Sequence, residues 1–229
     1  VRLNYVQGMV LTRYHQEHPT IAVDGDEVRV FWLSKATSPY QIRSIYSSDA
    51  GQTWGVGGFT YDLVDEEHVT DFLTAEFDSQ GGLHLVWQDV RGNTAPRPMK
   101  LVSSADGGET WTSPVTIDPF NTGHVDDPEG GYYLECCRHT IVPSSDGDVD
   151  VIYRQVDRFS SNETWYMYSG FLHWDANSQP TAATQIGDIW VTENRICPGT
   201  GPQMVTTEDG LAALWNNAGA MYLAFDNGT

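Results

Sequence analysis

Three aspartates alternate along one short stretch, Asp146-Gly147-Asp148-Val149-Asp150. Carboxylate oxygens are the ligands that Ca²⁺ prefers, and closely spaced acidic residues supply them in calcium-binding loops. The stretch does not reproduce the twelve-residue ligand pattern of an EF-hand, and Asp-Gly-Asp is also typical of a hairpin turn. Asp146, Asp148 and Asp150 are therefore a candidate calcium site, with a simple turn as the alternative, and no other cofactor is indicated.

Arginine and tyrosine residues are the second group of side chains that could bind a ligand. Arg154 and Arg195 lie near the ends of expected strands, and Tyr166 lies at the start of another. Side chains at strand ends could face a central channel, so these three residues are the candidates for ligand binding. Exposure to solvent or pairing with a carboxylate is the alternative role. If the protein is an enzyme, Tyr61 and Arg91 join them as the first residues to test.

The charge of the chain is strongly negative. Its 31 acidic residues against 12 basic ones give a formal net charge of -19 at pH 7. Such a surface repels phosphate backbones and anionic lipids, so we expect no nucleic-acid partner and no binding to membrane surfaces. No run of about eighteen apolar residues occurs, so we also expect no membrane insertion.

Several features favour the cell exterior. Lysine is scarce, tryptophan occurs 8 times, and Asn162 and Asn227 each begin an Asn-x-Thr sequence, which accepts N-linked glycans in secreted proteins. The chain begins at Val1 with neither an initiator methionine nor a signal peptide, which is typical of a processed chain or a fragment. We therefore expect an extracellular or cell-surface glycoprotein.

Four segments of the chain share one layout. Each has a short apolar strand, a turn rich in Asp and Gly, and a second strand that ends in an aromatic residue, at intervals of about 60 residues. The segments are 20–32, 73–87, 140–153 and 203–215, and a third strand follows each, at 41–46, 100–103, 165–169 and 220–225.

These strands predict an all-β fold. They are rich in β-branched and aromatic residues and are joined by Asp-Gly or Gly-Gly turns, and no segment shows a sustained helical period. A sheet of three or four strands cannot bury both of its faces alone; radial packing into a β-propeller is the usual solution, with a β-sandwich as the alternative. We expect one propeller domain over residues 1–229, with repeats at about 18–67, 68–135, 136–196 and 197–229, the last completed by 1–17.

Two octapeptides mark corresponding places in the first two repeats, SSDAGQTW at 47–54 and SADGGETW at 104–111. They resemble the Asp box, or BNR repeat, of sialidase-like β-propeller proteins. The resemblance implies that each forms the hairpin between the third and fourth strands of a blade, where the Asp accepts hydrogen bonds, the Gly supplies a positive φ and the Trp covers the turn. The structural positions are Ser47, Asp49, Gly51, Trp54, Ser104, Asp106, Gly108 and Trp111, together with Asp226 and Gly228 of an incomplete copy.

The octapeptide degrades along the chain. In the third repeat the corresponding segment, 168–174, lacks the Asp and the full spacing, and in the fourth a copy begins at Ala224 and stops at Thr229. Either the sequence continues in a larger protein, or the segment from Asn4 to Tyr14 supplies the outer strand of the last blade and closes a ring of four. Sialidases of this type have six blades, so four repeats depart from the pattern that the resemblance implies.

Three cysteines, Cys136, Cys137 and Cys197, permit one disulfide and leave one thiol. The segments 136–138, 151–154 and 197–202, with Trp190, are similar to a pattern in secreted bacterial sialidase-like propeller proteins of unassigned function. That resemblance implies a bridge from Cys197 to Cys136 or Cys137, joining the third repeat to the fourth. The alternative is redox or metal chemistry, although the vicinal pair lacks the ligand spacing of a zinc site.

The catalytic residues of sialidases are not recognisable in the chain. The resemblance would imply three arginines around the substrate carboxylate, a tyrosine activated by a glutamate, and an acid/base aspartate, with a Phe/Tyr-Arg-Ile-Pro signature before the first Asp box. The nearest match, at 194–198, has an inserted Cys and follows both boxes. We therefore favour a secreted or cell-surface, non-catalytic propeller that binds a glycan or a protein or assembles with itself. The alternative is a divergent glycoside hydrolase or polysaccharide lyase.

Overall fold

The computed structural model describes residues 16–34, 40–55, 60–62, 68–91, 99–118, 125–126, 132–133, 138–158, 165–177, 180, 184–192, 201–217 and 220–226. Within these ranges every regular element is a strand, so the prediction of an all-β fold is confirmed. In this part of the chain no helix is long and apolar enough to cross a membrane. The strands are β1 (Gln16–Asp24), β2 (Glu27–Ser34), β3 (Gln41–Ser47), β4 (Thr60–Asp62), β5 (His68–Phe77), β6 (Leu83–Arg91), β7 (Met99–Ser104), β8 (Val115–Asp118), β9 (Val125–Asp126), β10 (Tyr132–Tyr133), β11 (Thr140–Pro143), β12 (Val149–Arg158), β13 (Trp165–Trp174), β14 (Thr184–Thr192), β15 (Gln203–Thr207), β16 (Gly210–Asn217) and β17 (Ala220–Asp226).

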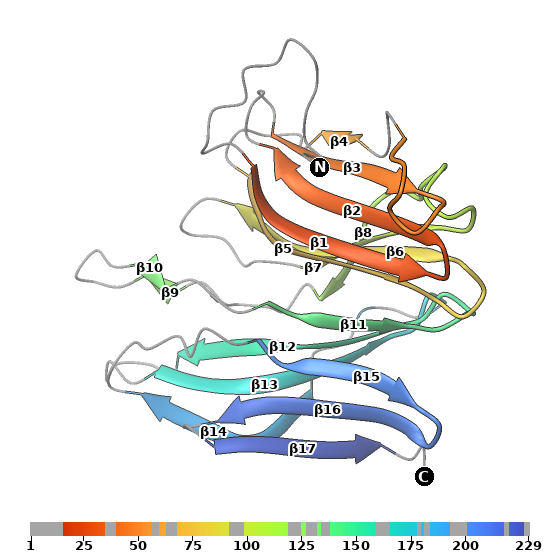
Figure 1. The fold of residues 1–229 in the computed structure, drawn as a ribbon. Helices are drawn as coiled ribbons and strands as arrows, with labels where there is room; N and C mark the ends of the chain where they lie inside the picture. Colours follow the sequence, from red (N-terminus) through yellow and green to blue (C-terminus); the bar gives the residue numbers. More distant parts are fainter. Residues whose placement is uncertain are drawn as a thin grey trace.

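Among the described strands, four antiparallel sheets have the strand orders β1-β2-β3-β4, β5-β6-β7-β8, β11-β12-β13-β14 and β15-β16-β17. Consecutive strands are neighbours in each sheet, so each sheet is a meander formed by one continuous segment, and the four sheets coincide with the four sequence repeats. β9 and β10 form a separate two-stranded ladder that the sequence did not predict. Figure 1 shows the four sheets stacked in chain order, with β1–β4 and β15–β17 at opposite ends.

Tight turns join the first two strands of every sheet, as the Asp-Gly and Gly-Gly pairs predict. Gly25, Gly81, Gly147 and Gly210 have φ values of 56°, 81°, 96° and 127°. Glycine adopts this region without the steric penalty that a Cβ brings, so these positions set the direction and register of the hairpins.

The third strand of the third sheet is longer than the sequence predicts. We expected it to end at Ser169, but β13 continues to Trp174 and pairs with β12 along its whole length. In the first two sheets the octapeptides begin where β3 and β7 end, at Ser47 and Ser104. The third repeat lacks the Asp that organises this turn, so nothing local ends the strand.

Apolar side chains between neighbouring sheets form two core clusters. One lies between the β1–β4 and β5–β8 sheets, and the other lies between the β5–β8 and β11–β14 sheets. Burial of such side chains drives the sheets together. The first cluster contains Ala22, Phe31, Leu33, Ile42, Leu73, Ala75, Leu83, Leu85, Trp87 and Val102, and the second contains Val86, Met99, Leu101, Ile117, Ile141, Val149, Val151, Tyr153 and Leu172.

The β15–β17 sheet buries only one of its faces. Met204 and Trp215 lie on the buried face, whereas the strand register places five large apolar side chains on the other, which we call the outer face. Apolar sheet faces of this kind are typical of surfaces that pack against another sheet. The outer face consists of Val205, Leu214, Met221, Leu223 and Phe225, each 39% to 64% exposed.

Some of the predicted residues lie outside the described ranges, and the predictions about them stay predictions. They concern the disulfide, the glycosylation sites, one ligand-binding candidate, the last glycine of the incomplete octapeptide and the ring-closing segment. These residues are Cys136, Cys137, Cys197, Asn162, Asn227, Arg195, Gly228 and 4–14.

Candidate functional site

The first octapeptide forms a turn that is held by its own polar groups. Ser47 Oγ donates a hydrogen bond to Asp49 Oδ1 at 2.7 Å and accepts one from the Gly51 amide at 2.8 Å. The Asp49 carboxylate accepts further bonds from the Thr53 amide at 2.7 Å and the Thr53 hydroxyl at 2.5 Å. Chiefly because of the Thr53 hydroxyl, the pKa of Asp49 is lowered to about 2. Trp54 Nε1 donates to the Gly51 carbonyl at 3.0 Å, so the indole closes the turn.

The second octapeptide repeats this arrangement. Ser104 Oγ donates to Asp106 at 2.7 Å and accepts from the Gly108 amide at 2.7 Å, and the hydroxyl and amide of Thr110 donate to Asp106 at 2.6 and 2.8 Å. These bonds lower the pKa of Asp106, the Thr110 hydroxyl contributing most. Trp111 also contacts Phe31 of the neighbouring sheet edge to face, at 5.8 Å between ring centroids. The Ser104, Asp106 and Thr110 side chains bond one another and the backbone of the turn, so the octapeptide supports the fold.

The candidate calcium residues lie in and beside a hairpin, and each carboxylate has a partner within the protein. Asp146 accepts a hydrogen bond from Ser144 in the turn, and Asp148 accepts one from the Ala176 amide at 2.9 Å. His173 lies 2.8 Å from Asp150 and 3.8 Å from Asp148. The hydrogen bond with Asp150 is the main cause that raises the pKa of His173. Among the described residues, no group of three or more His, Cys, Asp or Glu side chains is arranged to hold a metal ion.

The ligand-binding candidates fall on different strands. Arg154 lies on β12 opposite Ser169, and Tyr166 lies on the adjacent strand β13 opposite Asp157, so these two share one sheet. Of the two further candidates for an enzyme, Arg91 ends β6 of the preceding sheet. Tyr61 lies on the outermost strand of the first sheet. The register therefore places Arg154 and Tyr166 in the same sheet but three positions apart along the β12–β13 ladder, and Tyr61 in a different sheet.

A buried chain of three polar side chains in the second sheet was not predicted. His84 Nε2 lies 3.1 Å from Asp78 Oδ2, and His84 Nδ1 lies 3.0 Å from Ser103 Oγ. Asp78 also accepts hydrogen bonds from the amides of Gln80 and Gly82 at 2.8 Å each. Burial raises the pKa of Asp78, but its hydrogen bonds lower it by more, so the pKa is lowered overall. Ser, His and Asp follow one another as in a nucleophilic triad. The His84 side chain is only 4% exposed, however, so this chain ties the β5–β6 turn to β7 instead of meeting a substrate.

A second buried histidine precedes β11. This residue, His139, comes directly before β11, which begins at Thr140. Its Nε2 lies 3.3 Å from the Val86 carbonyl, while Nδ1 has no hydrogen-bond partner in the described structure. Burial lowers the pKa of His139 to about 4.

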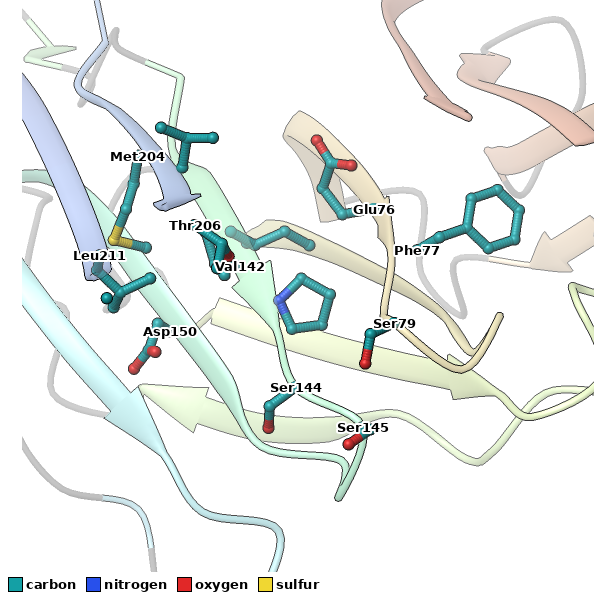
Figure 2. A pocket seen from close by; sticks show the side chains of 14 residues that line it. Glu76, Phe77, Ser79, Val142, Ser144, Ser145, Asp150, Met204, Thr206 and Leu211 are labelled. Carbon is teal, nitrogen blue, oxygen red and sulfur yellow. The ribbon is translucent and has the colours of Figure 1, made fainter. Parts of the chain in front are cut away.

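A cavity of about 650 Å³ lies where the first strands of three successive sheets meet. β5, β11 and β15 contribute its walls, together with the hairpin turns that follow β5 and β11 (Figure 2). Hydroxyl groups of Ser79, Ser144, Ser145 and Thr206 and apolar groups such as Met204 line it. The cavity combines apolar walls with a few polar groups, as small-molecule binding sites do.

Two carboxyl groups reach this cavity from opposite sides of β11. Glu76 lies on the face of the β5–β8 sheet opposite to Ala75, which is buried against the first sheet. Asp150 pairs with Val142 and faces away from its neighbours Val149 and Val151, which are buried against the second sheet. Figure 2 shows Glu76 and Asp150 on either side of the strand that carries Val142. The two carboxyl groups therefore do not face one another across the cavity.

Stacked antiparallel meanders of this kind are the architecture of β-propeller proteins. Solved structures that match the chain include propeller glycosidases, so the resemblance to sialidase-like propellers is supported as a likeness of fold. The number of blades, the closure of a ring and the assignment of the octapeptides to BNR repeats remain predictions.

Three of the matched structures show how far the similarity extends. A protein of unknown function from Dyadobacter fermentans has a TM-score of 0.57 and 15% identity, over 93% of this chain and 66% of that one. A sialidase from Trypanosoma rangeli has a TM-score of 0.55 and 14% identity, over 94% of this chain and 36% of that one. An α-L-arabinofuranosidase from Fusarium graminearum has a TM-score of 0.55 and 13% identity, over 88% of this chain and 57% of that one. The chain thus spans between about a third and two thirds of these proteins. No protein-family model and no curated protein sequence matches it.

Proposed function

We propose that this chain is a secreted or cell-surface propeller module that binds a glycan in the cavity around β11 without cleaving it. The observation that carries the proposal is the cavity itself, where hydroxyl groups, carboxyl groups and apolar walls converge on the first strands of three sheets. Glycans present hydroxyl groups and apolar ring faces, so they match both kinds of lining. The similarity in fold to proteins named as sialidase and arabinofuranosidase supports a glycan over a peptide.

The placement of the carboxyl groups favours binding over catalysis. Most glycoside hydrolases use two carboxyl groups that flank one glycosidic bond. In this cavity β11 lies between Glu76 and Asp150, and the Asp150 carboxylate is held by His173 at 2.8 Å. The two groups cannot act as an acid and base pair on one bond without a rearrangement of the strand between them.

Isothermal titration calorimetry with a panel of oligosaccharides tests the proposal. Thr206→Trp places a large side chain into the cavity and should abolish binding. Gln203→Trp makes the same kind of change on the same strand, at an exposed position that does not line the cavity, and should preserve binding. Equal affinities of the two variants for every glycan would show that the cavity is not the binding site.

A divergent glycan-active enzyme is the second candidate, and the likeness to glycosidase folds favours it. The first candidates for its active-site residues are Tyr61, Arg91, Arg154, Tyr166 and Arg195. The test is turnover of sialosides and of uronic-acid polysaccharides by the unmodified chain and by Arg154→Ala. Turnover that this substitution abolishes would replace the binding proposal.

Self-assembly is a third candidate, and the exposed outer face of the β15–β17 sheet favours it. The apolar residues of this face come from β15, β16 and β17, and β17 pairs with β16 alone among the described strands. An edge strand and an apolar face on one sheet are features through which sheets associate.

A further inference from the structure

Glu76 is a cavity-lining carboxyl group without a hydrogen-bond partner among the described residues. It makes no hydrogen bond or ion pair with any residue that the structure describes, and its pKa is raised by burial alone. Asp150 differs, since His173 already binds its carboxylate. Beside β5 the cavity therefore presents a carboxyl group whose hydrogen-bonding capacity is not used by any described residue.

The other groups around the cavity do not compensate this charge. Apart from Glu76 and Asp150, the described lining residues are uncharged, and none of them is Arg, Lys or His. A carboxylate that loses water without gaining a donor is destabilised relative to its protonated form. A bound ligand that brings a donor to Glu76 would recover that loss, and a cationic donor would recover more than a hydroxyl because charged hydrogen bonds are stronger.

Building on the proposed glycan-binding function, we propose that the cavity selects saccharides that carry a protonated amino group and that Glu76 binds this group. A hexosamine unit with a free amine satisfies the requirement. A neutral sugar offers only hydroxyl donors to Glu76. A uronic or sialic acid brings a negative charge toward the Glu76 carboxyl group, so the cavity disfavours such ligands.

Three β-1,4-linked tetrasaccharides test this selectivity, built from glucosamine, glucose and glucuronic acid, because they share one ring and linkage and differ in charge. At about pH 6 and low ionic strength the amine is protonated. We expect calorimetry to show that the glucosamine tetramer binds roughly tenfold or more tightly than the glucose tetramer. The glucuronic acid tetramer should bind most weakly.

Glu76→Gln and Glu109→Gln separate the local effect from the net charge. Both substitutions remove one negative charge, but Glu109 is exposed in the second octapeptide and does not line the cavity. Glu76→Gln should remove the advantage of the glucosamine tetramer, and Glu109→Gln should preserve it. If circular dichroism shows that Glu76→Gln does not fold, Thr206→Trp replaces it, and the advantage must disappear when the cavity is filled.

The outcomes distinguish this inference from the function on which it rests. Tetramers that bind in the cavity with no preference for the amine would overturn the selectivity and leave glycan binding intact. An advantage that Glu76→Gln retains would also overturn it. If none of the tetramers or panel glycans binds, or if Thr206→Trp leaves all binding unchanged, both proposals fail.

Discussion

Acidification should destabilise the protein through His139, because this histidine is buried as a neutral group. Its pKa is about 4 in the folded protein, against 6.5 for an exposed histidine. The unfolded chain therefore binds a proton at a pH where the folded chain does not. The stability that the neutral form contributes is complete above pH 6.5 and is lost as the pH falls toward 4. At 1.36 kcal/mol per pKa unit, the loss amounts to about 3 kcal/mol.

Urea unfolding followed by tryptophan fluorescence at a series of pH values between about 7.5 and 4 measures this effect. His139→Gln removes the titrating group but keeps a polar side chain. Over that pH range the free energy of unfolding of the variant should therefore fall by about 3 kcal/mol less than that of the unmodified protein. A constant offset between the two curves reflects packing and does not affect the comparison of slopes.

His173→Gln is the matched control with the opposite sign. Hydrogen bonding to Asp150 raises the pKa of His173, so this residue stabilises the folded protein below pH 6.5, and the contribution is lost as the pH rises through its raised pKa. Removing it should make acid destabilisation steeper. Asp49 and the other carboxyl groups with a lowered pKa act mainly below this range. Parallel curves for the unmodified protein and His139→Gln would refute the assignment.

Three further predictions concern the octapeptide, the junction between repeats and the outer face. Ser104→Ala should lower the free energy of unfolding by about 1–2 kcal/mol, because buried Ser104 bonds both Asp106 and the Gly108 amide, whereas the exposed Ser48→Ala should have little effect in the same urea titration. Gly201→Ala should lower the free energy of unfolding by about 1–3 kcal/mol or more, because the new Cβ would lie 2.1 Å from the Arg138 carbonyl oxygen. An unchanged melting temperature in thermal unfolding would contradict this contact. Leu223→Lys should reduce self-association in sedimentation velocity without loss of stability, with exposed Glu208→Lys as the control. If the unmodified chain sediments as a monomer at every concentration, assembly through this face is excluded.

The fold was largely predictable, and the exceptions have local causes. The four repeats, their turns and the place of the octapeptides between third and fourth strands agree with the sequence pattern. The end of β13 was wrong by five residues, because the prediction assumed a turn near Ser169 although the residues that organise such a turn are missing there. Sequence periodicity shows where strands begin, but it says less about where a strand ends when no turn-forming residue follows it.

The candidate site was much less predictable. Glu76 and the chain formed by Asp78, His84 and Ser103 carry no sequence motif, and neither was identified. The Asp-Gly-Asp stretch was interpreted as a candidate calcium site, with a turn as the alternative. In the structure its carboxylates bind Ser144, the Ala176 amide and His173.

The amino-acid sequence alone determined those features whose interacting groups lie within a few residues of one another. In each octapeptide the Ser, Asp, Gly, Thr and Trp bond one another within four positions, and each turn glycine acts on its own hairpin. Tertiary structure alone decided the cavity, because its walls come from β5, β11 and β15, which are far apart in the chain. Burial and the pKa of a carboxyl group depend on what other segments place around it. Glu76 therefore has no signature in sequence, and only the packing of three sheets makes it a candidate for ligand binding.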